Sequence, residues 1–188
     1  MSVPHTLDTG IYYSDLKNLL VKAGDKKNIY QTIVDAPFHN KPISARLGLG
    51  IVVLLLVNKE QGTIDRVALA KTELAQGTLN ISSKPFSEIK IPLDNRANYI
   101  AIAIRRKHHM ITSDWQYLFV PSLTPEESRM NQAGGGIACS VIYPLSGPKD
   151  GGALIFSYYE PVERIGKTHH EFMEKYTRMV SHQLLKDS

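Results

Sequence analysis

The stretch AGGGIACSVIYPL, residues 133–145, decides how the rest of this sequence is read. Three glycines follow a helical pattern and lead into a strand-like run that holds the only cysteine of the chain, Cys139. A phosphate-binding loop needs the opposite order, with a strand before the glycines and a helix after them. We therefore expect the glycines to end a helix and Cys139 to lie within a strand.

Two hairpins are predicted from apolar runs separated by turn residues. The strand at 137–143 is followed by PLSGPKDG and an apolar return strand at 152–159. Earlier in the chain, the buried run at 50–57 is followed by NKEQG and a half-buried strand at 63–70. Hairpins pair antiparallel strands, and MITSD at 110–114 resembles a further short strand.

Apolar residues at helical spacing predict helices between and around these strands. Asp94 is the expected N-cap of one helix, and both Thr124 and Thr168 begin a capping-box pattern. Residues 71–93 show no clear period, so they form a lid or contain short elements. The fold class is therefore α+β. The expected helices span 11–23, 28–36 (where Pro37 and Pro42 interrupt it), 95–107, 124–133 and 168 almost to the C-terminus.

Length and composition indicate one globular domain. The 188 residues are 43% hydrophobic and 21% charged, and the longest apolar run is too short to span a bilayer. A single cysteine excludes an internal disulfide and suits a reducing cytoplasm, and the N-terminus does not resemble a signal peptide. The net charge of +4 is spread along the chain, and its densest patch, RRKHH at 105–109, lies at an expected helix end. We expect a cytoplasmic protein with no membrane span and no nucleic-acid partner.

The order of these elements resembles a GAF domain, the small-ligand sensor module of many signalling proteins. GIACSVIYPL followed by GGALIFSYYEP resembles the final hairpin of the family, and GTIDRVALA and ITSDW resemble its second strand and the segment after its central helix. The resemblance covers roughly residues 28–186. It implies a mostly antiparallel sheet of five to six strands, with terminal helices on one face and a roofed ligand pocket on the other. Residues 1–27 would then be an N-terminal helical extension of a GAF-like domain over 28–188.

The candidate site follows from the alternation along the strand at 137–143. Ser140 and Cys139 lie on opposite faces of it, and we expect the Ser140 face to look into the pocket, as the matching serine does in bilin-binding relatives. Asp114 and Trp115 would orient and stack on a planar ligand, although a core tryptophan and a turn-forming aspartate remain an equal alternative. We expect Tyr158 to join this pocket from the return strand. The predicted ligand-binding residues are Asp114, Trp115, Tyr117, Cys139, Ser140 and Tyr158.

Catalysis and metal binding are not expected. A cysteine nucleophile needs a base or a cation nearby, and the neighbours of Cys139 in sequence supply neither. Family members that reduce free methionine sulfoxide use more than one cysteine, and bilin-binding members place theirs before the final hairpin, where residues 115–136 have none. His108–His109 and His169–His170 are adjacent pairs, so each pair points two ways from its helix.

The leading hypothesis is a regulatory sensor that binds an unknown small molecule or a partner, with no cofactor identified. The cyclic-nucleotide signature of the family, asparagine-lysine-phenylalanine-aspartate-glutamate, is absent. The alternatives are a cysteine-dependent redox enzyme and a degenerate module whose pocket is filled by its own side chains and which only dimerises. Apolar residues of both terminal helices, including Leu16, Leu19 and Leu20, predict a homodimer through those helices.

Overall fold

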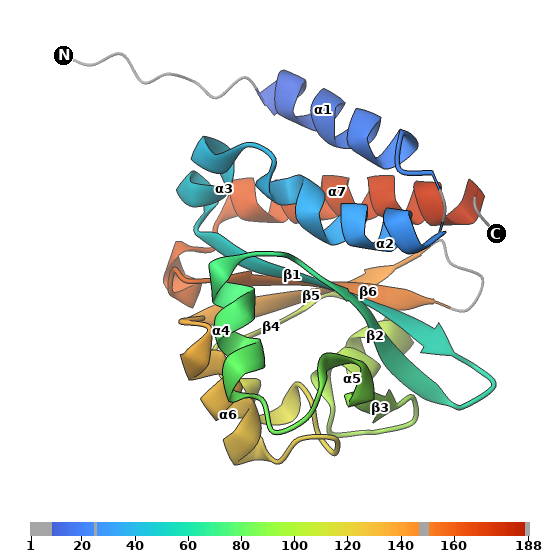
Figure 1. Cartoon of the computed structure of the whole chain (residues 1–188), viewed down its shortest axis with the longest axis vertical. Helices are drawn as coiled ribbons and strands as arrows, with labels where there is room; N and C mark the ends of the chain where they lie inside the picture. The colour runs from blue at the N-terminus through green and yellow to red at the C-terminus, as the bar shows by residue number, and fades with distance from the viewer. Residues whose placement is uncertain (1–8, 25, 147–150, 187–188) are drawn as a thin grey trace.

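The computed structural model describes residues 9–24, 26–146 and 151–186. Within them, one six-stranded sheet has the order β3-β2-β1-β6-β5-β4, and every neighbouring pair is antiparallel (Figure 1). The first hairpin, β1–β2, and the final hairpin, β5–β6, form the two halves of the sheet, and β1 pairs with β6 between them. The strands are β1 (Leu49–Asn58), β2 (Thr63–Leu69), β3 (Lys90–Pro92), β4 (Met110–Thr112), β5 (Cys139–Leu145) and β6 (Gly152–Tyr158).

Helices cover both faces of this sheet. One face carries α1, α2, α3 and α7, and the other carries α4, α5 and α6, which we call the roof (Figure 1). Among the described residues, no helix is long and apolar enough to cross a membrane. The helices are α1 (Thr9–Val21), α2 (Lys26–Asp35), α3 (Lys41–Leu47), α4 (Glu73–Ile81), α5 (Tyr99–Arg106), α6 (Pro125–Gly134) and α7 (Lys167–Lys186), with single 3₁₀ turns η1 (Ala36–Phe38), η2 (Phe86–Glu88), η3 (Trp115–Tyr117) and η4 (Val162–Arg164).

Alternation along the strands divides the interior into two cores. Cys139 and Val141 of β5 face the helical side with Leu16 of α1 and Phe172 of α7. Ile142 of β5 faces the roof, as do alternate residues of β1 and β6. The predicted α+β class, the mostly antiparallel sheet of five to six strands and the placement of both terminal helices on one face are therefore confirmed, with six strands that are all antiparallel.

The segment 71–93, which showed no period, contains α4, η2 and β3. Thr72 caps α4 by accepting a hydrogen bond from Ala75 N. Pro42, expected to interrupt a helix, instead lies in the first turn of α3, where a missing N–H costs nothing. Short helices of this kind lack enough turns to show an apolar stripe.

Two predicted caps are wrong and one is confirmed. Asn98, rather than Asp94, caps α5 by accepting hydrogen bonds from the backbone amides of residues 100 and 101. Thr168 lies inside the first turn of α7, because that helix already begins at Lys167. The capping box of Thr124 and Glu127 is formed at the start of α6.

The glycines at 134–136 end α6, as expected, and also allow it to touch α4. A Cβ atom on Gly77 of α4 would lie 2.3 Å from Gly134 O, and one on Gly135 would lie 2.5 Å from Thr78 Cγ2. Gly136 adopts φ of 62°, in the left-handed region that favours glycine. The turn expected from PLSGPKDG includes residues 147–150, which lie outside the described residues.

Candidate functional site

The turn η3 places Trp115 over the roof face of the final hairpin. Its indole Nε1 donates a hydrogen bond of 2.8 Å to Ser140 Oγ, and Ser140 Oγ lies 2.7 Å from Ser157 Oγ. All three side chains are buried, with exposed fractions of 4%, 0% and 1%. Ser140 and Ser157 are direct cross-strand partners on β5 and β6. A polar contact between the roof and the sheet is thus enclosed in an otherwise apolar core.

Asp114 anchors this turn at the surface. Its carboxylate accepts three hydrogen bonds of 2.8 to 3.0 Å from Arg129 of α6, and its Oδ1 also accepts one from Gln116 N. The hydrogen bonds from Arg129 lower the pKa of Asp114, so this pair keeps its charges at neutral pH. Asp114 is therefore both the cap of η3 and its link to α6.

Gln132, one helical turn after Arg129, holds the other side of the turn. Its Oε1 accepts a hydrogen bond of 2.9 Å from Trp115 N, and its Nε2 donates to Ser113 O and Ile137 O. Sequence reasoning missed Arg129, Gln132 and Ser157. The spacing of Arg129 and Gln132 on one helix face was the available signal, but their partners at 113–116 lie 13 to 19 residues away in the chain.

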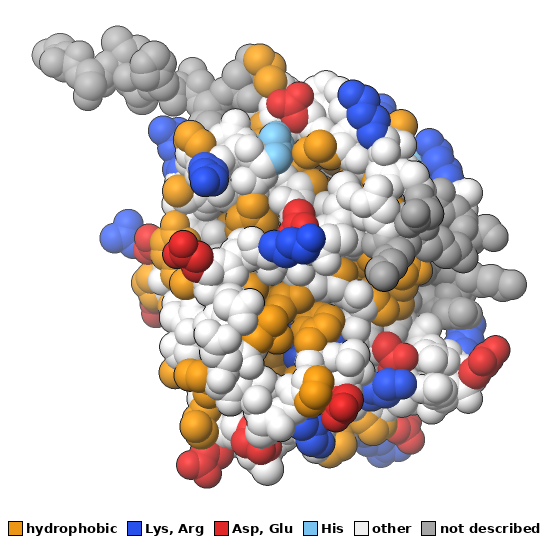
Figure 2. Space-filling view, viewed as in Figure 1, with side chains coloured by type: hydrophobic (Ala, Val, Ile, Leu, Met, Phe, Trp, Pro, Cys, Tyr) orange, Lys and Arg blue, Asp and Glu red, His pale blue; other side chains and the backbone are white. Residues whose placement is uncertain are grey.

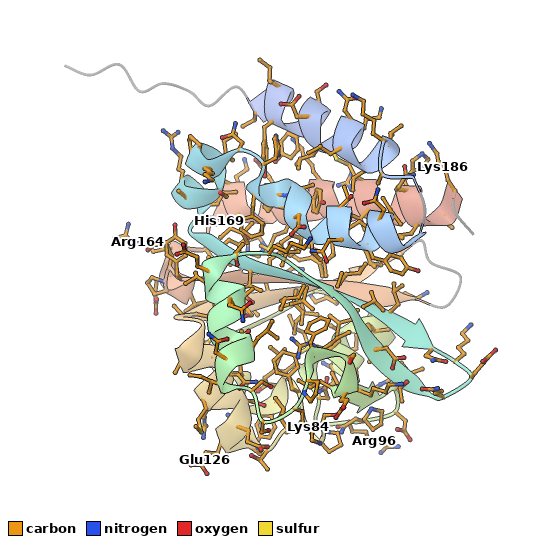
Figure 3. The ribbon with its side chains drawn as sticks, viewed as in Figure 1. Lys84, Arg96, Glu126, Arg164, His169 and Lys186 are labelled. Atoms are coloured by element: carbon orange, nitrogen blue, oxygen red, sulfur yellow. The ribbon has the colours of Figure 1, made fainter. Side chains whose placement is uncertain are left out.

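The protein's own side chains occupy the space around Trp115. Phe119 packs edge-on against the indole, with ring centroids 5.5 Å apart, and Leu118 is fully buried beside them. Figure 3 shows side chains filling the layer between the sheet and the roof helices. The predicted residue Tyr117 is 38% exposed and packs edge-on against Tyr99, so it lies on the outside of the roof.

Cys139 and Tyr158 lie on the opposite side of the sheet, against the terminal helices. We expected Tyr158 beside Ser140, but the hairpin register pairs it with Cys139 and places Ser157 opposite Ser140. The Cys139 thiol donates to Glu160 O at 3.4 Å, and burial raises its pKa to about 11. The hydroxyl of Tyr158 is buried and has no hydrogen-bond partner in the described part of the chain, and burial raises its pKa well above the ordinary value.

One histidine from each pair meets at the edge of β5. His109 stacks on Tyr143 with ring centroids 5.0 Å apart, and the Tyr143 hydroxyl lies 3.0 Å from His170 Nδ1. His169 points the other way and contacts Leu47 O at 3.1 Å, at the start of α7 (Figure 3). No group of three or more histidine, cysteine or acidic side chains suited to a metal ion occurs in the described part of the chain.

Comparisons with known proteins define the fold. No protein-family model and no curated protein matches the sequence. Among solved structures, the GAF domain of an Acinetobacter phosphoenolpyruvate-protein phosphotransferase matches with a TM-score of 0.62, 8% identity and coverage of 99% of this chain and 96% of that one. A phycoerythrobilin-bound GAF domain from a cyanobacterial phytochrome matches with a TM-score of 0.61, 15% identity and 97% coverage of both chains.

An enzyme has a similar structure. Free methionine-R-sulfoxide reductase from Neisseria meningitidis, in complex with its substrate, matches with a TM-score of 0.60, 9% identity and coverage of 95% of this chain and 91% of that one. At these identities the likeness concerns the fold and not the site. The six-stranded antiparallel sheet between terminal helices and a helical roof is the GAF-domain fold.

Proposed function

We propose that this chain is a regulatory sensor module in which the roof over Ser140 and Ser157 responds to a small molecule or a partner. The hydrogen bond between Trp115 and Ser140 carries the proposal, because it joins the roof to the sheet at the place where a GAF-type pocket is expected. Binding would shift the population between this closed arrangement and one in which Trp115 leaves the serines. The two buried hydroxyls would then be available to ligand polar groups.

The residues that hold Trp115 in place connect a movement of this side chain to other parts of the molecule. Asp114 and Gln132 tie the turn η3 to α6, and α6 packs against α4 through backbone contacts at glycine. On the far edge, His109 stacks on Tyr143, which contacts His170 of α7. A shift of β4 and β5 would therefore reach a terminal helix directly.

The predicted ligand residues divide into two groups under this proposal. Asp114, Trp115, Tyr117 and Ser140 belong to the roof side and would form or gate the site. Cys139 and Tyr158 stay predictions, and they would meet a ligand only if it reached the helical face of the sheet. We also propose that residues 1–27 extend a GAF-like unit over 28–188, that the chain forms homodimers through its terminal helices and that it acts in the cytoplasm.

A second candidate, a degenerate module that acts only through dimerisation, is supported by the same packing. Trp115 and Phe119 fill the space that a ligand would take, so the closed arrangement is also what a module without a ligand would need. The redox alternative has less support, because a fully buried thiol with a raised pKa is a poor nucleophile.

The fluorescence of Trp115, the single tryptophan of the chain, tests the proposal directly. Native mass spectrometry of the purified protein would first detect a co-purified small molecule, and compounds would then be titrated while Trp115 emission is recorded. We expect a true ligand to shift the emission and to bind at least about tenfold more weakly to Ser140→Ala, because one buried hydrogen-bond partner is lost. Ser113→Ala, at an exposed position, is the matched control. If no compound changes the emission and none co-purifies, the results favour the degenerate module over the ligand sensor.

A further inference from the structure

Arg66 of β2 is a partly buried cation that has no anionic partner among the described residues. Its guanidinium carbon lies 4.0 Å from the ring centroid of Phe86 and 4.8 Å from that of Phe119. Its Nε is buried and has no hydrogen-bond partner, and none of the ion pairs among the described residues involves it. Burial lowers the pKa of Arg66 to about 9. The two aromatic contacts stabilise the charge but satisfy none of its N–H donors.

A groove of about 600 Å³ lies between β2 and α4; its lining begins at Val67, the residue after Arg66, and includes Phe86, whose ring the guanidinium contacts. β3 pairs with residues 63–65 of β2, and beyond them no strand of the described chain covers this edge of β2, which leaves room for the groove. Figure 2 shows hydrophobic side chains gathered around a hollow in the middle of this face. The walls are mainly apolar, and they include Val67, Leu69, Leu79 and Phe86, with Lys71 and Gln76 also in the lining.

The groove and the cation meet at Phe86, which lines the groove and lies against the guanidinium. A groove of this volume is in the range of small-molecule sites, and its walls suit an apolar body. A partly buried guanidinium whose Nε has no partner among the described residues favours an anion, and its planar donors match a carboxylate best. We propose that this groove binds a small monocarboxylate with an apolar body, whose acid group is recognised by Arg66. Glu73, which also lines the groove, disfavours a second acid group on the ligand.

This site goes beyond the one proposed around Trp115 and does not depend on it. Phe119 connects the two, because its ring contacts both the guanidinium and the indole. Trp115 emission therefore serves as a second readout of groove binding, in addition to a direct measurement of affinity.

Octanoate is a suitable probe, and isothermal titration would compare it with octan-1-ol and octylammonium on the whole chain. We expect octanoate to bind at least about tenfold more tightly than either analogue, as a charge-assisted hydrogen bond requires. In Arg66→Gln, octanoate should bind no more tightly than the two analogues. Arg106→Gln, which removes the same charge from an exposed position, should keep the tighter binding of octanoate.

Gln76→Glu keeps the proposal falsifiable if Arg66→Gln does not fold. This exposed, nearly isosteric change places a negative charge in the groove lining and should weaken octanoate binding several-fold while leaving octan-1-ol unaffected. Equal binding of octanoate and octan-1-ol, or unchanged octanoate affinity in Arg66→Gln or Gln76→Glu, would overturn the proposal. If octanoate fails to bind while another compound shifts Trp115 emission, the groove is rejected and the proposed function stands.

Discussion

The Cys139 thiol lies on the helical face of β5, fully buried and hydrogen-bonded to Glu160 O. Its neighbour Ser140 faces the roof and contacts Trp115. One step along a strand thus separates a thiol packed into a structural core from a hydroxyl at the candidate site, because successive side chains point to opposite faces.

We predict that Cys139 reacts with 5,5′-dithiobis(2-nitrobenzoate) at pH 8 only when the protein unfolds. With a pKa of about 11, roughly one thiol in a thousand is deprotonated at that pH, and burial blocks the reagent. The colour change should therefore be slow in buffer and fast in urea, which exposes the same thiol and serves as the control. Rapid reaction of the native protein would instead support the cysteine-dependent enzyme.

At the level of single residues, the faces of β5 were predictable and the contacts across the core were not. A period of two assigned Ser140 and Cys139 to opposite sides correctly. Tyr158 was misplaced because its face depends on the register with β5, which the sequence of the turn did not specify. Trp115 and Ser140 are 25 residues apart, and no local pattern joins them.

Among the elements, α4 and α6 depend on each other. Gly77 and Gly134 let their backbones approach more closely than any side chain would allow. The same glycine, Gly77, explains why α4 was not predicted. A nine-residue helix with a glycine inside it has a weak helical pattern in the sequence. The strands were easier to predict than the helices of the roof. A hairpin is indicated by alternating apolar and polar residues and by turn residues, and these lie close together in the sequence.

We predict that Gly77→Ala lowers the free energy of unfolding, although alanine favours a helix by about 1 kcal/mol over glycine. The added Cβ would lie 2.3 Å from Gly134 O, and overpacking of this kind costs about 1–3 kcal/mol. Urea unfolding followed by circular dichroism measures the sign. Gly166→Ala, where no described residue lies within 4 Å of the new Cβ, should leave the stability nearly unchanged. A more stable Gly77→Ala would mean that the helices separate easily and that the contact is not tight.

For the whole molecule, the terminal helices form the surface farthest from the roof. α1 and α7 pack against each other on the helical face, and both end on the side marked by Lys186 (Figure 3). Leu16 and Leu20, which the sequence offered for a dimer seam, are buried within the chain at 0% and 2% exposure. The large apolar side chains of α1 and α7 that remain exposed are Ile11, Leu19, Val21 and Leu185, with exposed fractions of 62%, 36%, 59% and 54%.

A two-fold dimer formed at the ends of α1 and α7 near Lys186 would bury Leu19, Val21 and Leu185 in its interface. We therefore predict that Val21→Lys together with Leu185→Lys converts the dimer to a monomer at micromolar concentration, because charges replace apolar area that the partner would cover. Sedimentation velocity measures this, and circular dichroism checks that the fold is kept, as expected for substitutions at exposed positions. Met130→Lys on α6, 53% exposed on the opposite side of the sheet, adds a charge away from the interface and should remain dimeric. A wild-type chain that sediments as a monomer would refute the dimer. A double variant that stays dimeric would move the interface away from these helix ends, to another surface of the molecule.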